Sequence, residues 1–235
     1  MAYLGSAFSQ ALSAAGTTVS GAYTRAVAAG NTLVAGFCVS PAVTSVADNA
    51  GNTYTLMATG TANGGFTTYI YAKSNCNAVT TSTTFTLTVS SSTNAACVVL
   101  AFSTGDGTKD ASAVGAPGAS TTPSIGPTGA VSQANEFLVA VYAGFAGGSV
   151  ESFSATGAWT VGATATAVIG SGADIMFAYS EYQVLTNASG AYTGTGTLSV
   201  APGANSAALV TFKDTIFDPF PVAYEHHPQN TLLRM

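Results

Sequence analysis

The stretch TFTLTVSS at residues 84–91 alternates polar and apolar side chains. Phe85, Leu87 and Val89 fall on one side of an extended chain and the threonines between them on the other, because successive side chains of a strand point to opposite faces. This period of two predicts a half-buried β-strand whose three apolar residues face a core.

Similar strand-like runs recur along the chain, and clusters of Gly, Asn and Pro separate them. No segment shows sustained helical periodicity. Short strands at regular spacing predict an all-β fold, a jelly-roll-like antiparallel β-sandwich with negligible helix. We expect its core to include Phe85, Leu87, Val89, Val99, Leu100, Val139, Val141, Leu209 and Val210.

The order of these runs in the first half of the chain returns in the second half. GNTLVAGFCVS is similar to ANEFLVAVYAG, VADNAGNTYTL to FSATGAWTVG, TTYIYAKSN to ADIMFAYSEY, and NAACVVLAFS to NSAALVTFK. An offset of about 104 to 110 residues is too long for a solenoid repeat. The similarity therefore predicts two weakly similar half-units.

We expect these half-units, at about residues 17–104 and 134–213, to complete one sandwich domain that spans residues 1–213. A connection rich in Pro, Gly, Ser and Thr, residues 105–133, joins them. Two small tandem sandwiches are the alternative, because each half contains enough short strand-like runs for a sandwich of its own.

The succession of VTSVADNAGNTYTL, TTYIYAKSN, TTFTLTVSS and VVLAFS, followed by NEFLVAVYAG, GAYTGTGTL and AALVTFK, resembles a broad group of jelly-roll-like β-sandwich domains. Such domains occur in secreted bacterial proteins and in phage particle proteins. The resemblance covers about residues 30–213. It implies a fold and a setting, but no catalytic residues.

The composition argues against two classes of partner. Only 6% of the residues are charged, and the formal net charge of −5 comes with no basic cluster, so nucleic acid is not expected. No apolar run has the length of a transmembrane helix, so a membrane is not expected either. Residues 1–25 lack the parts of a signal peptide, which predicts synthesis in the cytoplasm, although abundant Ala, Thr, Ser and Gly are typical of proteins outside cells.

The three cysteines cannot all pair within one chain. Cys38 and Cys97 lie in apolar strand-like runs, where a reduced thiol packs as a small hydrophobic group. Cys76, in KSNCNAV, is turn-like. We expect three reduced thiols, with Cys76 exposed.

Two loops carry oxygen ligands at spacings that calcium uses in other sandwich proteins. They are DNAGN, which begins at Asp48, and GDGTKD, which contains Asp106 and Asp110. A hairpin turn explains the first loop equally well, with Gly51 at positive φ. Because no distant bidentate Glu is assignable, we expect no cofactor or metal, and calcium is the alternative.

Aromatic residues suggest either packing or a sugar-binding surface. Trp159 could stack on a sugar beside Tyr192, but the half-unit similarity aligns it with Tyr54, which favours a packing role. Tyr69 and Tyr71 alternate on one strand face, as cross-strand aromatic pairs do.

Catalysis finds little support in the sequence. The carboxylates are scattered and no nucleophile elbow is present, so we expect no enzyme. Glu225, His226 and His227 form the only cluster of metal-capable groups. Adjacent residues of an extended chain point to opposite sides, so both imidazoles would not reach one ion.

The composition changes after Lys213. The remaining residues contain no Gly or Ser, but hold three prolines and both histidines. We expect residues 214–235 to form an extended arm that docks on a neighbouring subunit, since its apolar side chains can supply the buried area that ordering requires. The expected partner-binding residues are Phe217, Phe220, Val222, Tyr224, Leu232 and Leu233.

These features together suggest a non-enzymatic phage virion protein, most consistent with a capsid decoration or cement protein that is made in the host cytoplasm and released by lysis. Its expected partners are the major capsid protein or neighbouring copies in a homo-oligomer. The alternative is a carbohydrate-binding or adhesive β-sandwich module of a surface or secreted protein, located outside the cell or on its surface.

Overall fold

The computed structural model describes residues 2–103, 106–147, 152–169 and 174–214, and these residues form β-strands and loops with no helix. The all-β, antiparallel sandwich expected from the sequence is confirmed. The strands are β1 (Tyr3–Ala22), β2 (Thr32–Val39), β3 (Val43–Asp48), β4 (Thr55–Thr59), β5 (Thr67–Lys73), β6 (Thr84–Phe102), β7 (Lys109–Gly115), β8 (Ser124–Ile125), β9 (Glu136–Gly147), β10 (Phe153–Ala155), β11 (Thr160–Ile169), β12 (Asp174–Leu185), β13 (Gly194–Leu198) and β14 (Ala204–Lys213).

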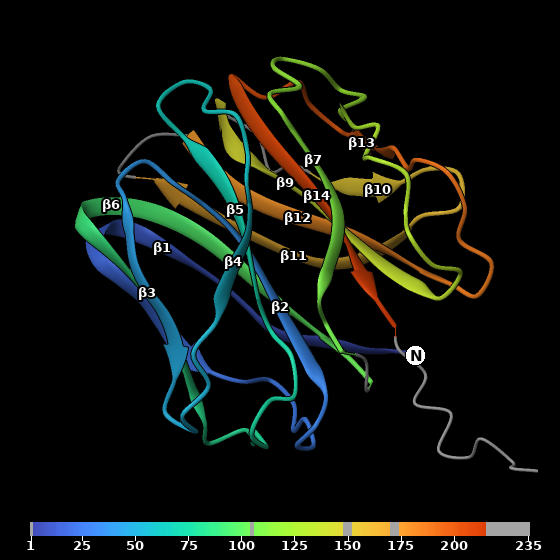
Figure 1. The fold of residues 1–235 in the computed structure, drawn as a ribbon. Coiled ribbons are helices and arrows are strands. Elements are labelled where there is room, and N and C mark those ends of the chain that lie inside the picture. The colour runs from blue at the N-terminus through green and yellow to red at the C-terminus, as the bar shows by residue number, and fades with distance from the viewer. Residues whose placement is uncertain (1, 104–105, 148–151, 170–173, 215–235) are drawn as a thin grey trace, which may run out of the picture.

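The strands form three sheets (Figure 1). The first has the order β1-β6-β2-β5-β4, and β3 also pairs with β6. The second has the order β11-β12-β9-β14-β7, and the third, smaller sheet has the order β10-β13-β8. The first sheet thus comes from the first half of the chain. The other two sheets come from the second half together with β7 and β8, which lie in the connection at residues 105–133.

The similarity between the halves corresponds to the same local arrangement of strands. In the first sheet β2 lies between β5 and β6, and in the second sheet β9 lies between β12 and β14. These are the strands formed by the similar sequences. β3 pairs with the first part of β6 in the same way that β10 pairs with β13.

The apolar side chains gather in three layers. The first core lies on one face of the first sheet and includes Phe37 and Phe85, and the third lies between the second sheet and the small sheet and includes Tyr142 and Trp159. The middle core lies between the two large sheets and includes Val34 of the first and Val139 of the second. The central strands of both large sheets are therefore buried on both faces, which explains their continuous apolar runs.

The core residues expected from the sequence are all buried. Each has 6% or less of its surface exposed: Phe85, Leu87, Val89, Val99, Leu100, Val139, Val141, Leu209 and Val210. Phe37 stacks with Tyr69 and Tyr71 at centroid distances of 5.7 and 5.6 Å, which confirms the expected aromatic pairing.

Two details differ from the expectations. Residues 105–133 do more than connect the halves, because β7 within them forms an edge of the second sheet. Cys76 is buried, with 2% exposure, instead of exposed. A bridge between Val27 and Val79 joins the loop that contains Cys76 to the loop before β2, and the Cys76 thiol donates to the Ala28 carbonyl at 3.6 Å.

Side chains tie the edges of the two large sheets to each other. At one edge, the Tyr3 hydroxyl donates to the Gly162 carbonyl of β11 at 2.9 Å. At the opposite edge, Lys109 Nζ on β7 donates to the Met57 carbonyl of β4 at 3.0 Å. These bonds use carbonyls on edge strands, where unpaired backbone groups otherwise invite association.

Candidate functional site

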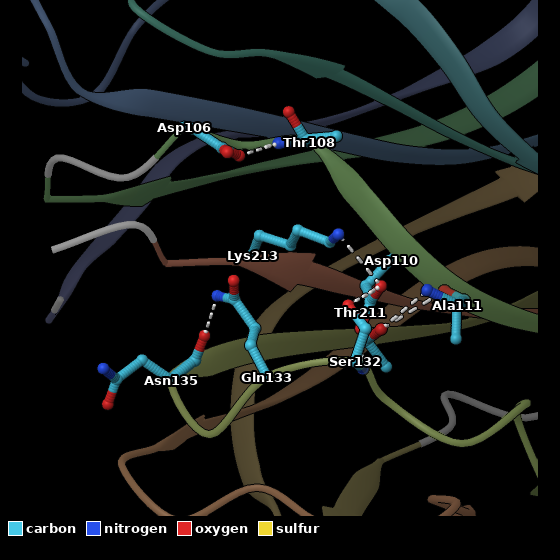
Figure 2. A network of polar contacts seen from close by, with 9 residues as sticks. All are labelled: Asp106, Thr108, Asp110, Ala111, Ser132, Gln133, Asn135, Thr211 and Lys213. Atoms are coloured by element: carbon cyan, nitrogen blue, oxygen red, sulfur yellow. Dashed lines mark hydrogen bonds and ion pairs between the residues drawn. The ribbon is translucent and has the colours of Figure 1, made fainter.

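A network of polar side chains lies where β14 ends, between β7 and the start of β9 (Figure 2). Asp110 is its centre. The carboxylate of Asp110 accepts hydrogen bonds from the backbone amide and the hydroxyl of Ser132, at 2.5 and 2.6 Å. Lys213 Nζ lies 3.5 Å from Asp110 Oδ1, and only 8% of the Asp110 side chain is exposed.

Neighbouring contacts hold the backbone around this cluster. The Thr211 hydroxyl accepts a hydrogen bond from the Ala111 amide at 2.9 Å, across a register shift between β7 and β14. The Asp106 carboxylate accepts from the Thr108 amide at 2.6 Å (Figure 2). The cluster therefore fixes the edge strand β7 and the end of β14 to each other.

Glu136, the first residue of β9, lies beside Asp110 and has no exposed surface. Neither of its buried carboxyl oxygens has a well-formed hydrogen bond from a donor. Burial raises the pKa of Glu136 to about 8, and the adjacent Asp110 carboxylate adds to this rise. Burial also acts to raise the pKa of Asp110, but the hydrogen bonds from Ser132 prevail and hold it below its usual value.

A second buried carboxyl group, Glu181 on β12, lies beside the third core, on the same face of the second sheet as Glu136. It accepts a hydrogen bond from the Tyr142 hydroxyl at 3.0 Å, and its other oxygen has no partner. Burial raises the pKa of Glu181 to about 8. A side chain at Gly194 would lie within 3 Å of both groups, so a glycine is required there.

The sequence-based search for sites missed both glutamates. Glu136 lies in NEFLVAVY and Glu181 in FAYSEYQVL, so each is a single acidic residue next to or inside an apolar run. That isolation is the available signal, since a charge in a strand buried on both faces cannot turn to solvent.

The DNAGN loop is a hairpin turn whose aspartate is fully engaged. Asp48 Oδ1 accepts from the amides of Ala50 and Asn52, at 3.0 and 3.1 Å. Asp48 Oδ2 accepts from the Tyr23 hydroxyl and from Asn52 Nδ2, both at 2.9 Å. Gly51 has the expected positive φ, 85°. The carboxylate thus closes the turn in the way that turn aspartates do.

Trp159 packs inside the protein, as its alignment with Tyr54 indicated. Its side chain is 8% exposed, and Nε1 donates to the Thr193 carbonyl at 2.9 Å. Tyr54 is 5% exposed in the equivalent core of the first half. A buried indole presents no face on which a sugar can stack, so the sugar-binding interpretation loses its main residue.

The expected partner-binding residues lie outside the described part of the chain. They are Phe217, Phe220, Val222, Tyr224, Leu232 and Leu233. Glu225, His226 and His227 lie outside it as well.

Within the described ranges, His, Cys, Asp and Glu residues form no group of three or more that could hold a metal ion. The same residues contain no helix long and apolar enough to cross a membrane. Comparisons with protein-family models, curated proteins and solved structures find no match to this chain.

Proposed function

We propose that this protein is a non-enzymatic structural component of a phage virion, a capsid decoration or cement protein, which attaches to the major capsid protein or to neighbouring copies through residues 214–235. The observation that carries the proposal is that the strands of the sandwich are already paired before this segment begins. The last strand, β14, already has a partner on each side, β9 and β7. The apolar cores of the described residues extend no further than Phe212.

The start of the segment is held firmly on the sandwich. The Lys213 amide donates to the Thr108 carbonyl at 2.9 Å, and the Asp214 amide donates to the Asn135 carbonyl at 3.0 Å. An arm that starts from a fixed point reaches a partner with less loss of conformational freedom than an arm that starts from a loose one.

The sequence of the arm suits a docking role. Phe217 and Phe220 are large apolar anchors of the kind that carry most of the binding energy in interfaces. Pro219 and Pro221 flank Phe220 and restrict the free chain, which lowers the entropy that is lost on binding.

Removal of the arm tests this function. We expect a protein truncated after Asp214 to melt at nearly the temperature of the full chain in calorimetry, because no described core strand is removed. The truncated protein should fail to co-sediment with particles purified from the native source and should sediment as a smaller species. A collapsed melting transition would show instead that the segment belongs to the fold of its own sandwich.

Point variants refine the test. Replacing Phe217 and Phe220 together by Ala should reduce co-sedimentation, because each phenylalanine is expected to contribute about 2 kcal/mol or more to the free energy of binding. Asn230→Ala, a polar change in the same segment, is the matched control and should retain binding. Equal binding by all variants would contradict attachment through the two phenylalanines.

A further inference from the structure

The surroundings of the Glu136 carboxyl group favour its protonated form over its ionised form. It is fully buried, and an ionised carboxylate in that place would lack well-formed hydrogen bonds to both oxygens. Burying an unpaired charge costs far more than burying a neutral acid. Glu136 is therefore best accommodated with its proton on.

Asp110 is the neighbouring group that would receive this proton: Lys213, which pairs with Glu136 across β14 and β9, also lies with its Nζ 3.5 Å from Asp110 Oδ1. Asp110 reaches Glu136 from β7, and its own charge is satisfied by Ser132 and Lys213. A protonated Glu136 donates to an ionised Asp110, so one proton holds two carboxyl groups together. Loss of that proton places two like charges in contact in a buried site.

We propose that Asp110 and Glu136 form a proton-binding pair that clamps the edge strand β7 and the end of β14 to β9, and that loss of the shared proton loosens both segments. The proposal concerns the sandwich itself and holds whether or not residues 215–235 dock on another subunit. Its function would be to make the start of the C-terminal segment sensitive to mildly alkaline conditions.

The geometry explains why the loosening is local. β7 is an edge strand with a neighbour in the second sheet on one side only, and its pairing with β14 is interrupted between Val210 and Phe212. Asp110 lies at that interruption, opposite the root of the C-terminal segment. Repulsion between the carboxylates therefore acts where backbone pairing is weakest.

The other charged groups nearby do not replace the proton. Lys213 contacts Asp110, and both Lys213 and the Thr211 hydroxyl lower the pKa of Glu136, but burial and Asp110 outweigh them and leave that pKa at about 8. Lys109 donates to the Met57 carbonyl, and Asp106 accepts from the Thr108 amide. Asp214 follows Lys213 and is also buried, and it adds a further carboxyl group to this end of β14.

Tryptic cleavage of the full-length protein tests the clamp, because Lys213 lies at its end and Arg25 is an exposed reference site on a bend between β1 and β2. The measured quantity is the rate of cleavage after Lys213 divided by the rate after Arg25. Between pH 7 and pH 9 we expect this ratio to rise about tenfold, following the ionised fraction of a carboxyl group with a pKa near 8.

Glu136→Gln keeps the shape of the side chain and removes the titration, so its ratio should stay constant between pH 7 and pH 9. Glu181→Gln is the matched control: it removes a second buried carboxyl group, which lies on the same face of the sheet but on β12, bonded to Tyr142, and it should retain the rise. A constant ratio in the unaltered protein, or an undiminished rise in Glu136→Gln, would overturn the proposal.

A measurement on the unaltered protein covers the case in which Glu136→Gln does not fold. Carbon-detected NMR should show a glutamate carboxyl signal that titrates near pH 8 and is coupled to an aspartate signal. If both carboxyl groups titrate below pH 6, the pair binds no proton at neutral pH. If millimolar calcium abolishes the rise in cleavage at pH 9, the pair is a cation site and the proton clamp is excluded.

Discussion

Tyr54 and Trp159 occupy equivalent positions in the two halves of the molecule. Each follows a turn glycine with positive φ, Gly51 at 85° and Gly157 at 66°. Tyr54 is buried in the first core and Trp159 in the third core. The Tyr54 hydroxyl is hydrogen-bonded to the Tyr23 hydroxyl, and the Trp159 indole donates to the Thr193 carbonyl. The similarity between the halves thus extends to a structural aromatic residue.

Trp159→Ala should destabilise the protein by about 3–5 kcal/mol, because it removes a large buried side chain and opens a cavity in the third core. Urea denaturation followed by circular dichroism measures this change, since the variant loses the only tryptophan. Thr160→Ala, at an exposed neighbouring position, is the control and should change stability little. Unchanged stability of Trp159→Ala together with lost retention on immobilised glycans would favour a sugar-stacking role.

Phe85→Ala should cost about 3–5 kcal/mol as well, because this ring is fully buried. It packs against Phe8 and Tyr54 at centroid distances of 4.9 and 5.7 Å. Thr86→Ala changes the next residue on the opposite face and should cost much less. Comparable losses of stability for the two variants would contradict the assignment of Phe85 to the buried face of β6 and of Thr86 to the opposite face.

The first part of β6 and the outer turns could be predicted from the sequence because they have one face toward solvent. There the period of two is visible, as at Phe85, and turn chemistry identifies Asp48 and Gly51. The half-unit similarity also predicted that Trp159 would be structural, because it aligned with a second aromatic residue.

The sequence did not predict the parts of the fold in which polar and apolar residues no longer alternate. β9 and β12 are buried on both faces, so the sequence does not show which face Glu136 or Glu181 occupies, or that the two share one face of the sheet. β7 was missed because an edge strand needs few apolar residues. The pairing of Asp110 with Glu136 depends on the topology, which brings together β7 and β9 on either side of β14.

Asp48→Ala should destabilise the protein by about 1–3 kcal/mol, since it leaves buried donors such as the Tyr23 hydroxyl without their acceptor. EDTA should leave the melting temperature of the unaltered protein unchanged, because each oxygen of Asp48 already accepts two hydrogen bonds. Asp106→Ala, at an exposed position, is the control. A fall in melting temperature with EDTA that calcium reverses would establish a metal site.

The stability of the whole sandwich should fall as the pH rises from about 5 to about 8. Glu136 and Glu181 have pKa values of about 8 in the folded protein, well above the value of about 4.3 for an unfolded glutamate. Between these values the folded state retains protons that the unfolded state has released. The free energy of unfolding is therefore greatest below the unfolded pKa, and it falls by on the order of a few kcal/mol as the pH rises toward the folded pKa. Calorimetry at pH 5, 6.5 and 8 measures the trend, and combining Glu136→Gln with Glu181→Gln should flatten it. A melting temperature that is constant over this range in the unaltered protein would show that both carboxyl groups ionise in the fold.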